Sequence, residues 1–261
     1  MTAVDPYDAL PGMRWTRLSR MRRSPLHFRR GGEPDTDALV VGRAIHSLVL
    51  GGPPVVVFED TRRGKTWESY RDEHADAIIL YPRQQRAVVD CAAAVLRDPS
   101  ASALLAGTER EVAITWTQDG RPCKCRIDAM GGTLIIDLKT TRDASPHAFA
   151  RAAAGYRYAH QLAWYRRGHR SRYPDTVPDC YLIAAENAEP YDVAVYAVED
   201  TDIDLADREV SDLWARYIDC VERDEWPGCS PEPDTLRLPE WAFSDDDGAP
   251  LTMGGESVEV E

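Results

Sequence analysis

The chain has 261 residues, 43% of them hydrophobic, and a formal net charge of −13. This length and composition predict one α/β domain with a sizeable core rather than two separate domains. The sequence has no 18-residue apolar run and no signal-peptide-like apolar segment near its start, so we expect a cytoplasmic protein with no membrane contact.

The cysteines give no indication of a metal centre. The six of them show neither a CxxC nor a Cys/His spacing of the kind that binds zinc. We therefore expect reduced thiols that are mostly buried.

Charge is unevenly distributed along the chain. Residues 1–185 carry 27 Lys and Arg against 21 Asp and Glu, whereas residues 186–261 carry 4 against 23. Two stretches contain arginines and no acid, with seven arginines in 14–30 and six in 151–173. Such stretches are typical of phosphate-binding surfaces and also of solvated helix faces. We expect the acidic last third to aid solubility, to repel DNA from one face or to contact a partner.

Periodicity and turn residues predict the following elements in chain order. A basic N-terminal segment (1–35), irregular or helical, precedes the main domain (36–227). We expect helices at 36–50, 81–97, 100–106 and 203–224, and strands at 55–58, 109–117, 121–130, 133–139, 180–185 and 191–198. Ser145-Pro146 predicts the start of one long helix ending near 168. This order is typical of a mixed sheet flanked by helices.

The end of the chain lacks periodicity. Residues 228–261 are rich in Pro, Asp and Gly, which predicts a poorly ordered acidic tail. Two apolar stretches within it, 236–238 and 241–243, are candidates for docking on the domain or on a neighbour.

The most informative stretch is a predicted hairpin around Gly131-Gly132. A loop centred on these glycines places Asp128 opposite Ile135 and Arg126 opposite Asp137. Because side chains alternate along a strand, one face then carries Lys124, Arg126, Asp128, Asp137 and Lys139. The other face, with Cys123, Cys125, Ile127, Ala129, Leu134, Ile136 and Leu138, is expected to form a wall of the core.

The polar face of this hairpin suits metal-assisted hydrolysis of phosphodiesters. Carboxylates at diagonal cross-strand positions lie roughly 7–8 Å apart at the backbone, so their oxygens can meet at one ion. Mg²⁺ takes oxygen ligands and commonly uses one or two carboxylates plus a substrate phosphate. Lys139 can orient or help deprotonate the attacking water. The alternative is an exposed hairpin face that carries only ion pairs.

Asp128 followed by Asp137-Leu138-Lys139 on a hairpin resembles the active-site signature of the PD-(D/E)xK nuclease superfamily. Three other stretches resemble its RecE-type (exonuclease VIII-like) and RecB-type branch. They are Ser24-Pro25-Leu26-His27-Phe28, the helix from Gly42 to Leu50 with His46 in a G-x-x-x-H-x-L-x-L pattern, and Gln161 to Tyr165 in a Q-x-x-x-Y pattern. The four matches follow the order of the branch from about residue 19 to 185.

The resemblance implies a restriction-endonuclease-like fold and a site for Mg²⁺, or Mn²⁺. In it, His46, Asp128 and Asp137 bind the metal, the backbone carbonyl of Leu138 is a further ligand, and Glu111 is an auxiliary acid. Lys139 activates water, while Gln161 and Tyr165 orient Lys139, the water or the DNA. The arginines predicted to contact DNA are Arg22, Arg23, Arg126, Arg157 and Arg166.

By the same resemblance we expect a bacterial or phage-encoded DNA exonuclease that acts on linear duplex ends in recombination. RecE-like relatives degrade from 5′ ends as ring-shaped homo-oligomers and pass the single strand to an annealing protein. A RecB-type single-strand nuclease or an endonuclease would share the site. A non-catalytic DNA-binding module and an interaction protein acting through its acidic last third are the remaining alternatives.

Overall fold

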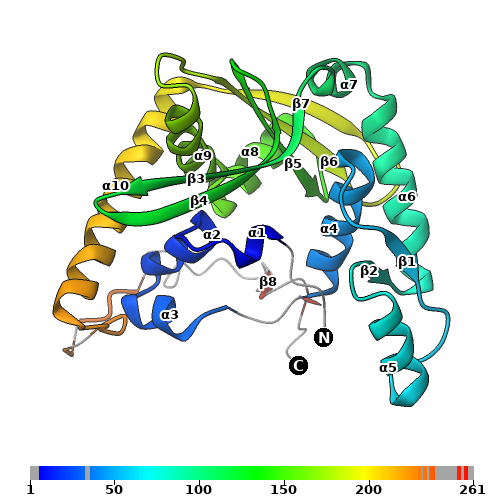
Figure 1. Ribbon diagram of the computed structural model, residues 1–261, viewed down its shortest axis with the longest axis horizontal. Coiled ribbons are helices and arrows are strands. Elements are labelled where there is room, and N and C mark those ends of the chain that lie inside the picture. The colour runs from blue at the N-terminus through cyan, green and yellow to red at the C-terminus, as the bar shows by residue number, and fades with distance from the viewer. Residues whose placement is uncertain are drawn as a thin grey trace.

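The computed structural model describes residues 6–32, 36–230, 232–233, 235–238, 252–253 and 256–257. A mixed sheet with helices on both sides lies at the centre of this part of the chain (Figure 1). The mixed α/β fold predicted from the sequence is therefore confirmed. Within the described ranges, every helix is too short or too polar to cross a membrane.

The central sheet has five strands in the order β3-β4-β5-β6-β7. Their bounds are Glu109–Gln118, Arg121–Met130, Leu134–Thr141, Asp179–Glu186 and Val193–Val198. The β5–β6 pair is parallel and the other pairs are antiparallel. A parallel pair needs a long crossover connection, which α8 and α9 supply here. A separate parallel pair joins β1 (Val55–Val57) to β2 (Ile78–Leu80), a strand that sequence reasoning missed.

The structure contains the helices that the apolar periodicity predicts, together with additional ones. The predicted ones are α4 (Asp37–Leu50), α6 (Pro82–Arg97), α7 (Pro99–Leu105) and α10 (Asp200–Arg223). The N-terminal segment contains α1 (Pro6–Ala9), α2 (Trp15–Leu18), the 3₁₀ helix η1 (Ser19–Arg22) and α3 (Pro25–Arg30). An unpredicted helix, α5 (Gly64–Glu73), joins β1 to β2.

The single long helix predicted from Ser145 to about residue 168 is wrong. The structure has α8 (Pro146–Tyr156) and α9 (Tyr158–Arg172), and Arg157 between them is left-handed, with φ 62° and ψ 46°. Gly155, two residues earlier, lowers the helix propensity of the last turn of α8. The break therefore comes at the weakest point of the predicted helix, without a proline.

The predicted register of the β4–β5 hairpin is also wrong, by two residues. Met130 pairs with Ile135 and Ala129 with Ile136, so the turn is centred after Gly132 rather than between the two glycines. The N–H of Gly131 donates to the carbonyl of Leu134 at 3.0 Å, which fixes this longer turn. Because the register is shifted by an even number of residues, each side chain stays on the face predicted for it. If the pairing is extended by one residue, Asp128 lies opposite Asp137.

Two apolar clusters fill the space around the sheet. One includes Ile127, Trp164 and Trp214, and the other includes Ile45 and Leu138. The predicted core wall of the hairpin is divided between them. Cys123, Cys125 and Ile127 belong to the first cluster, and Ala129, Ile136 and Leu138 to the second. The hairpin is therefore covered on both sides and not on one alone.

The basic N-terminal segment is part of the first cluster. It contributes the buried side chains of Met13, Trp15, Leu18, Met21 and Phe28. Its chain also joins the edge of β4, because the Met13 N–H donates to the Pro122 carbonyl at 2.9 Å and the Lys124 N–H donates to the Met13 carbonyl at 2.7 Å.

Lys124 does not lie on the exposed polar face where the hairpin pattern put it. Its ammonium donates to the carbonyls of Tyr7 at 2.8 Å and Leu10 at 2.7 Å. It is 4% exposed and holds α1 against β4.

Most of the predicted C-terminal tail lies outside the described residues, including 241–243. In its described part, Leu236 is 84% exposed and Leu238 is 54% exposed, so this stretch does not dock on the domain. A short antiparallel pair joins β8 (Thr252–Met253) to β9 (Glu256–Ser257).

Candidate active site

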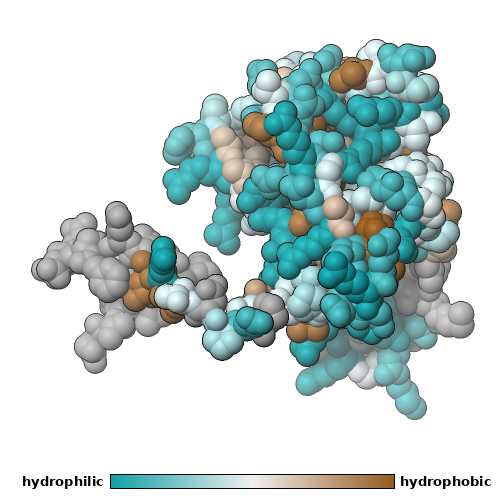
Figure 2. All heavy atoms as spheres, turned by 90° about the vertical axis from the view of Figure 1, so that its left-hand side faces the viewer, coloured by the Kyte–Doolittle hydropathy of each residue, from teal (hydrophilic) through white to brown (hydrophobic). Residues whose placement is uncertain are grey.

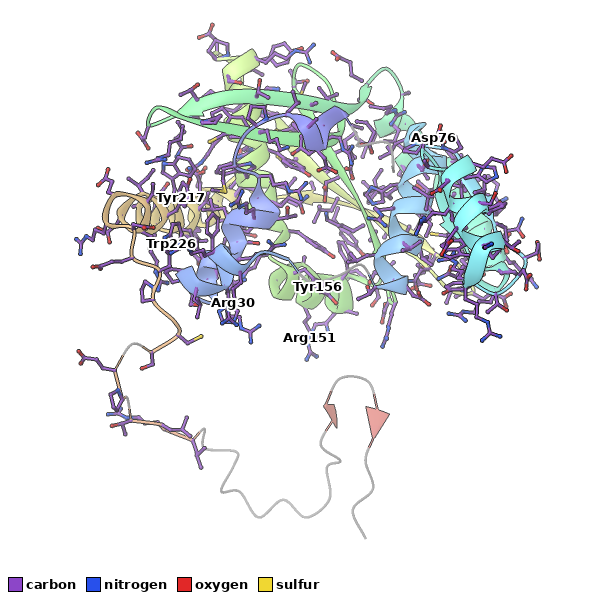
Figure 3. The ribbon with its side chains drawn as sticks, turned by 60° about the horizontal axis from the view of Figure 1, so that its bottom comes forward. Arg30, Asp76, Arg151, Tyr156, Tyr217 and Trp226 are labelled. Carbon is purple, nitrogen blue, oxygen red and sulfur yellow. The ribbon has the colours of Figure 1, made fainter. Side chains whose placement is uncertain are left out.

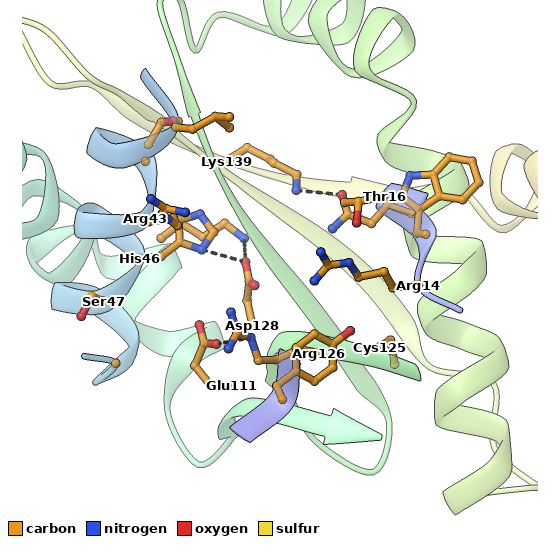
Figure 4. A pocket seen from close by; sticks show the side chains of 18 of the residues that line it. Arg14, Thr16, Arg43, His46, Ser47, Glu111, Cys125, Arg126, Asp128 and Lys139 are labelled. Atoms are coloured by element: carbon orange, nitrogen blue, oxygen red, sulfur yellow. Dashed lines mark hydrogen bonds and ion pairs between the residues drawn. The ribbon is translucent and has the colours of Figure 1, made fainter. Parts of the chain in front are cut away.

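A pocket of about 490 Å³ opens where α2, α4, β3, β4, β5 and α9 meet. Helix α4 brings His46, β3 brings Glu111, β4 brings Asp128 and β5 brings Lys139 (Figure 4). Helix α9 adds Gln161. These residues are up to 115 positions apart in the chain, from 46 to 161. The pocket therefore assembles all the separated motifs of the sequence except the Ser24–Phe28 stretch.

Ser24 and His27 of that stretch have a local structural role. Ser24 N-caps α3, because its hydroxyl accepts from the His27 N–H at 3.2 Å, and it lies 2.6 Å from His27 Nδ1. Pro25 follows at the first helical position, where its missing N–H costs nothing.

Three side chains at one side of the pocket form a potential metal-binding group. One ligand atom each from His46, Glu111 and Asp128 lies within 4.8 Å of the others. An imidazole and two carboxylates suit Mg²⁺ or Mn²⁺, which keep further positions for water and phosphate. The residues present thus fit the ion that the sequence predicts.

Protonation in this group favours metal binding by the imidazole. Burial, with Lys139 adding to it, lowers the pKa of His46 below its ordinary value. A neutral imidazole is the form that binds metals. His46 Nδ1 lies 3.4 Å from Asp128 Oδ2, which also accepts from the Leu138 N–H at 2.8 Å. Burial raises the pKa of Asp128, and Lys139 opposes that rise.

The backbone conformation of Glu111, which belongs to the potential metal-binding group, is unusual. Its φ is +50°, in the left-handed region that non-glycine residues seldom adopt, and it lies within strand β3. Its carboxylate pairs with Arg126 at 2.9 Å. Arg126 lies on β4, and its guanidinium carbon stands 5.1 Å from the ring centroid of Tyr7.

Asp137 and Lys139 form the centre of a second polar group. The Lys139 ammonium lies 2.5 Å from Asp137 Oδ2 and donates to Gln161 Oε1 at 3.0 Å. Gln161 Nε2 in turn donates to Asp137 Oδ1 at 3.3 Å and to the Tyr165 hydroxyl at 2.6 Å. Of the alternative partners predicted for Gln161, Lys139 is the one that it contacts here, and Gln161 contacts every other member of this group.

Asp137 is almost fully buried, with 2% of its side chain exposed. Burial raises its pKa to about 6, and Lys139 limits the rise. The pKa of Tyr165 is also raised by burial, so its hydroxyl stays protonated. Asp137 thus contacts Lys139 directly, whereas Glu111 takes a place in the metal-binding group beside His46 and Asp128.

Of the five arginines predicted to contact DNA, only Arg126 lines the pocket. Arg22 and Arg23 are exposed on the N-terminal segment. Arg157 lies 3.6 Å from Glu209, and Arg166 binds Asp200 and the Pro178 carbonyl with 11% of its side chain exposed.

The acids that pair with these two arginines come from α10. A third pair, Arg167 with Asp207 at 2.7 Å, also joins α9 to α10. Much of the basic stretch at 151–173 is therefore neutralised by the acidic last third, and that side of the molecule presents mainly hydrophilic residues (Figure 2).

Several residues that line the pocket were missed from the sequence. Arg43 lies one turn before His46 on α4, and Tyr158 lies one turn before Gln161 on α9. Helical spacing could have identified both. Arg14 and Thr16 come from the N-terminal segment, and only its tertiary packing brings them there (Figure 4).

The fold is that of the PD-(D/E)xK nuclease superfamily. Residues 26–239 match the family model described as a PDDEXK-like domain of unknown function (DUF3799), and the chain belongs to that family. None of the curated proteins matches it.

One solved structure agrees on the fold. A "putative exonuclease" from Eubacterium rectale superposes with a TM-score of 0.64 at 16% identity, over 90% of this chain and 92% of that one. A phage-related exonuclease from Haemophilus somnus 129PT gives a TM-score of 0.37 at 12% identity, over 85% of this chain and 100% of that one. The first of these matches supports the architecture, and the second is too weak to add to it.

Proposed function

We propose that the protein is a Mg²⁺-dependent DNA exonuclease that hydrolyses phosphodiester bonds and resembles the RecE type of phage recombination. The observation that carries this proposal is the meeting of separated motifs at one pocket, where His46, Asp128, Lys139 and Gln161 line the same space. Chance matches to short motifs have no reason to converge when they come from four different elements.

His46, Glu111 and Asp128 hold the ion in this proposal, with Mn²⁺ as a substitute for Mg²⁺. Asp137 and the Leu138 carbonyl, which adjoin this group, are the further ligands. A bound ion would supply Lewis-acid activation of the phosphate and of the attacking water.

Lys139 orients that water and stabilises the charge that develops on the phosphate. Its ammonium is already fixed by Asp137 at 2.5 Å and Gln161 at 3.0 Å, so little ordering remains to be done in the reaction.

Arg14, Arg43 and Arg126 add positive charge around the pocket for the DNA backbone. Arg22 and Arg23 are the outer phosphate contacts, while a homo-oligomeric ring and a single-strand annealing protein are the partners that the resemblance suggests.

Hydrolysis of end-labelled linear duplex DNA tests this proposal. We expect stepwise loss of the 5′ label with Mg²⁺ and none with EDTA, and no cutting of a closed circular duplex. Cutting of the circle would instead indicate an endonuclease, and hydrolysis confined to single strands a RecB-type enzyme with the same site. Failure to hydrolyse any of these DNAs with Mg²⁺ or Mn²⁺ would contradict the proposal and favour a DNA-binding module.

A further inference from the structure

Tyr156, the last residue of α8, is unusual in its exposure. It is 74% exposed. All other Phe, Trp and Tyr side chains in the described part of the chain are buried or half-buried. A single exposed apolar residue is ordinary on a protein surface, so the meaning of Tyr156 depends on what lies beside it.

Tyr156 stacks on Tyr158, the first residue of α9. Their ring centroids are 5.8 Å apart and the ring planes differ by 16°. The left-handed Arg157 between them turns the chain from one helix into the next. The pair therefore presents a flat aromatic surface, with Tyr156 outermost.

The inner ring of this pair reaches the proposed catalytic group. Tyr158 lines the pocket, and Lys139 Nζ lies 4.7 Å from the centroid of its ring. A cation near a ring face at this distance makes a favourable cation–π contact. Contacts thus run without a gap from the exposed Tyr156 through Tyr158 to Lys139.

Positive charge accompanies the aromatic surface. Arg151 is exposed on α8, whereas Arg157, between the two tyrosines, is paired with Glu209 at 3.6 Å. Figure 3 shows Arg151 and Tyr156 projecting from α8 on the same side of the molecule. Exposed aromatic rings with nearby cations are the combination that binds unpaired nucleotides, because the rings stack on bases while the cations follow the phosphates.

We propose that Tyr156 and Tyr158 form a stacking platform for an unpaired base at the mouth of the pocket. The strand that reaches Lys139 is therefore single-stranded on this side, either as a free single strand or as a duplex end that has opened. A base inside an intact duplex has both faces covered by its neighbours and cannot stack on Tyr156. This inference rests on the proposed nuclease function and specifies the form of its substrate.

Equilibrium binding in EDTA tests the platform without any cleavage. The probe is a short single-stranded oligonucleotide carrying 2-aminopurine, whose fluorescence falls when it stacks, and a closed circular duplex is the comparison. The variants are Tyr156→Ala, Tyr156→Leu and Tyr156→Phe, with Val177→Ala, at a residue 67% exposed on the surface, as the control. Thermal unfolding of each variant checks that the fold is kept.

We expect Tyr156→Ala and Tyr156→Leu to weaken single-strand binding about 5- to 100-fold and to abolish the quenching. Tyr156→Phe and Val177→Ala should stay within about twofold of the parent, and duplex binding should be unchanged in all four. Parent-like binding by Tyr156→Leu would overturn the inference, since an apolar contact would then suffice. So would an equal loss of single-strand and duplex binding.

The result is separable from that of the proposed function. A protein that hydrolyses DNA but binds single strands equally well after Tyr156→Ala would refute the platform alone. Stacking of the probe by a protein that hydrolyses no DNA would support the platform and refute the nuclease.

Discussion

Arg126 and Glu111 form an ion pair of 2.9 Å at the edge of the metal-binding group. The single negative charge of Glu111 cannot fully neutralise both the Arg126 guanidinium and a bound metal ion at the same time. We therefore expect Arg126 to compete with a bound ion for Glu111, and a DNA phosphate that pairs with Arg126 to relieve this competition.

Arg126→Gln is expected to tighten Mn²⁺ binding roughly 2- to 10-fold in the absence of DNA. The size follows from the modest strength of partly exposed ion pairs. Calorimetric titration with Mn²⁺ measures it, and Arg151→Gln controls for the loss of a more distant charge. In the Glu111→Gln background the substitution should have little effect. Unchanged or weaker binding by Arg126→Gln alone would contradict the competition.

Gln161→Ala should lower kcat about 10- to 100-fold with little change in KM. Gln161 contacts both Lys139 and Asp137, and misplacing a catalytic group by about 1 Å can cost this much. Tyr165→Phe removes one partner of Gln161 and should cost less than Gln161→Ala. Gln85→Ala, at an exposed position of α6, is the matched control. A rise in KM with kcat preserved would mean that Gln161 binds DNA and does not position Lys139.

The contribution of Asp137 to the stability of the metal-free protein should fall as pH rises from about 4 to 7. Burial raises the pKa of Asp137 from 3.8 to about 6, so the folded state retains a proton that the unfolded state releases. The stabilising contribution is thus fully present below about pH 4 and is lost as pH rises through 6. Its upper limit is about 3 kcal/mol.

Urea unfolding in EDTA at several pH values measures this effect. In Asp137→Asn the part of the pH dependence that belongs to this carboxyl should disappear. Addition of Mg²⁺ at pH 7 should stabilise the parent protein more than the variant, which lacks one of the proposed ligands. A parent and a variant with the same pH dependence would contradict the role assigned to burial.

Much of the site followed from local sequence patterns, and what did not depends on tertiary contacts. His46 and the Asp137-x-Lys139 triplet come together because each motif fixes its own face of a helix or strand. Glu111 enters the metal-binding group through a φ of +50°, which no sequence pattern at that position indicates. Arg166 pairs with Asp200, which lies 34 residues away in the chain. The sequence alone therefore could not distinguish arginines that are paired with acids from arginines that are available to DNA.

The close packing of α9 against the sheet at Gly168 offers a test of the fold. A Cβ at Gly168 would lie 2.6 Å from Cys125 Sγ and 3.1 Å from the Trp116 ring, so Gly168→Ala should lower the free energy of unfolding by about 1–3 kcal/mol. Gly155→Ala in α8 has open space around it and should raise that energy by up to about 1 kcal/mol. Chemical denaturation measures both. Equal effects would mean that α9 does not pack as described.

The central claim is that Asp137 and Lys139 belong to a metal-dependent nuclease centre. Comparison of the parent with Asp137→Ala, on end-labelled linear duplex DNA with Mg²⁺, tests it most directly. Asp143→Asn is the control, because Asp143 is an exposed acid only six residues away whose side chain accepts from the Ser145 N–H. We expect Asp137→Ala to lose all detectable hydrolysis while still binding DNA, and Asp143→Asn to act like the parent. Full activity in Asp137→Ala would contradict the claim, because DNA hydrolysis would then take place at another site.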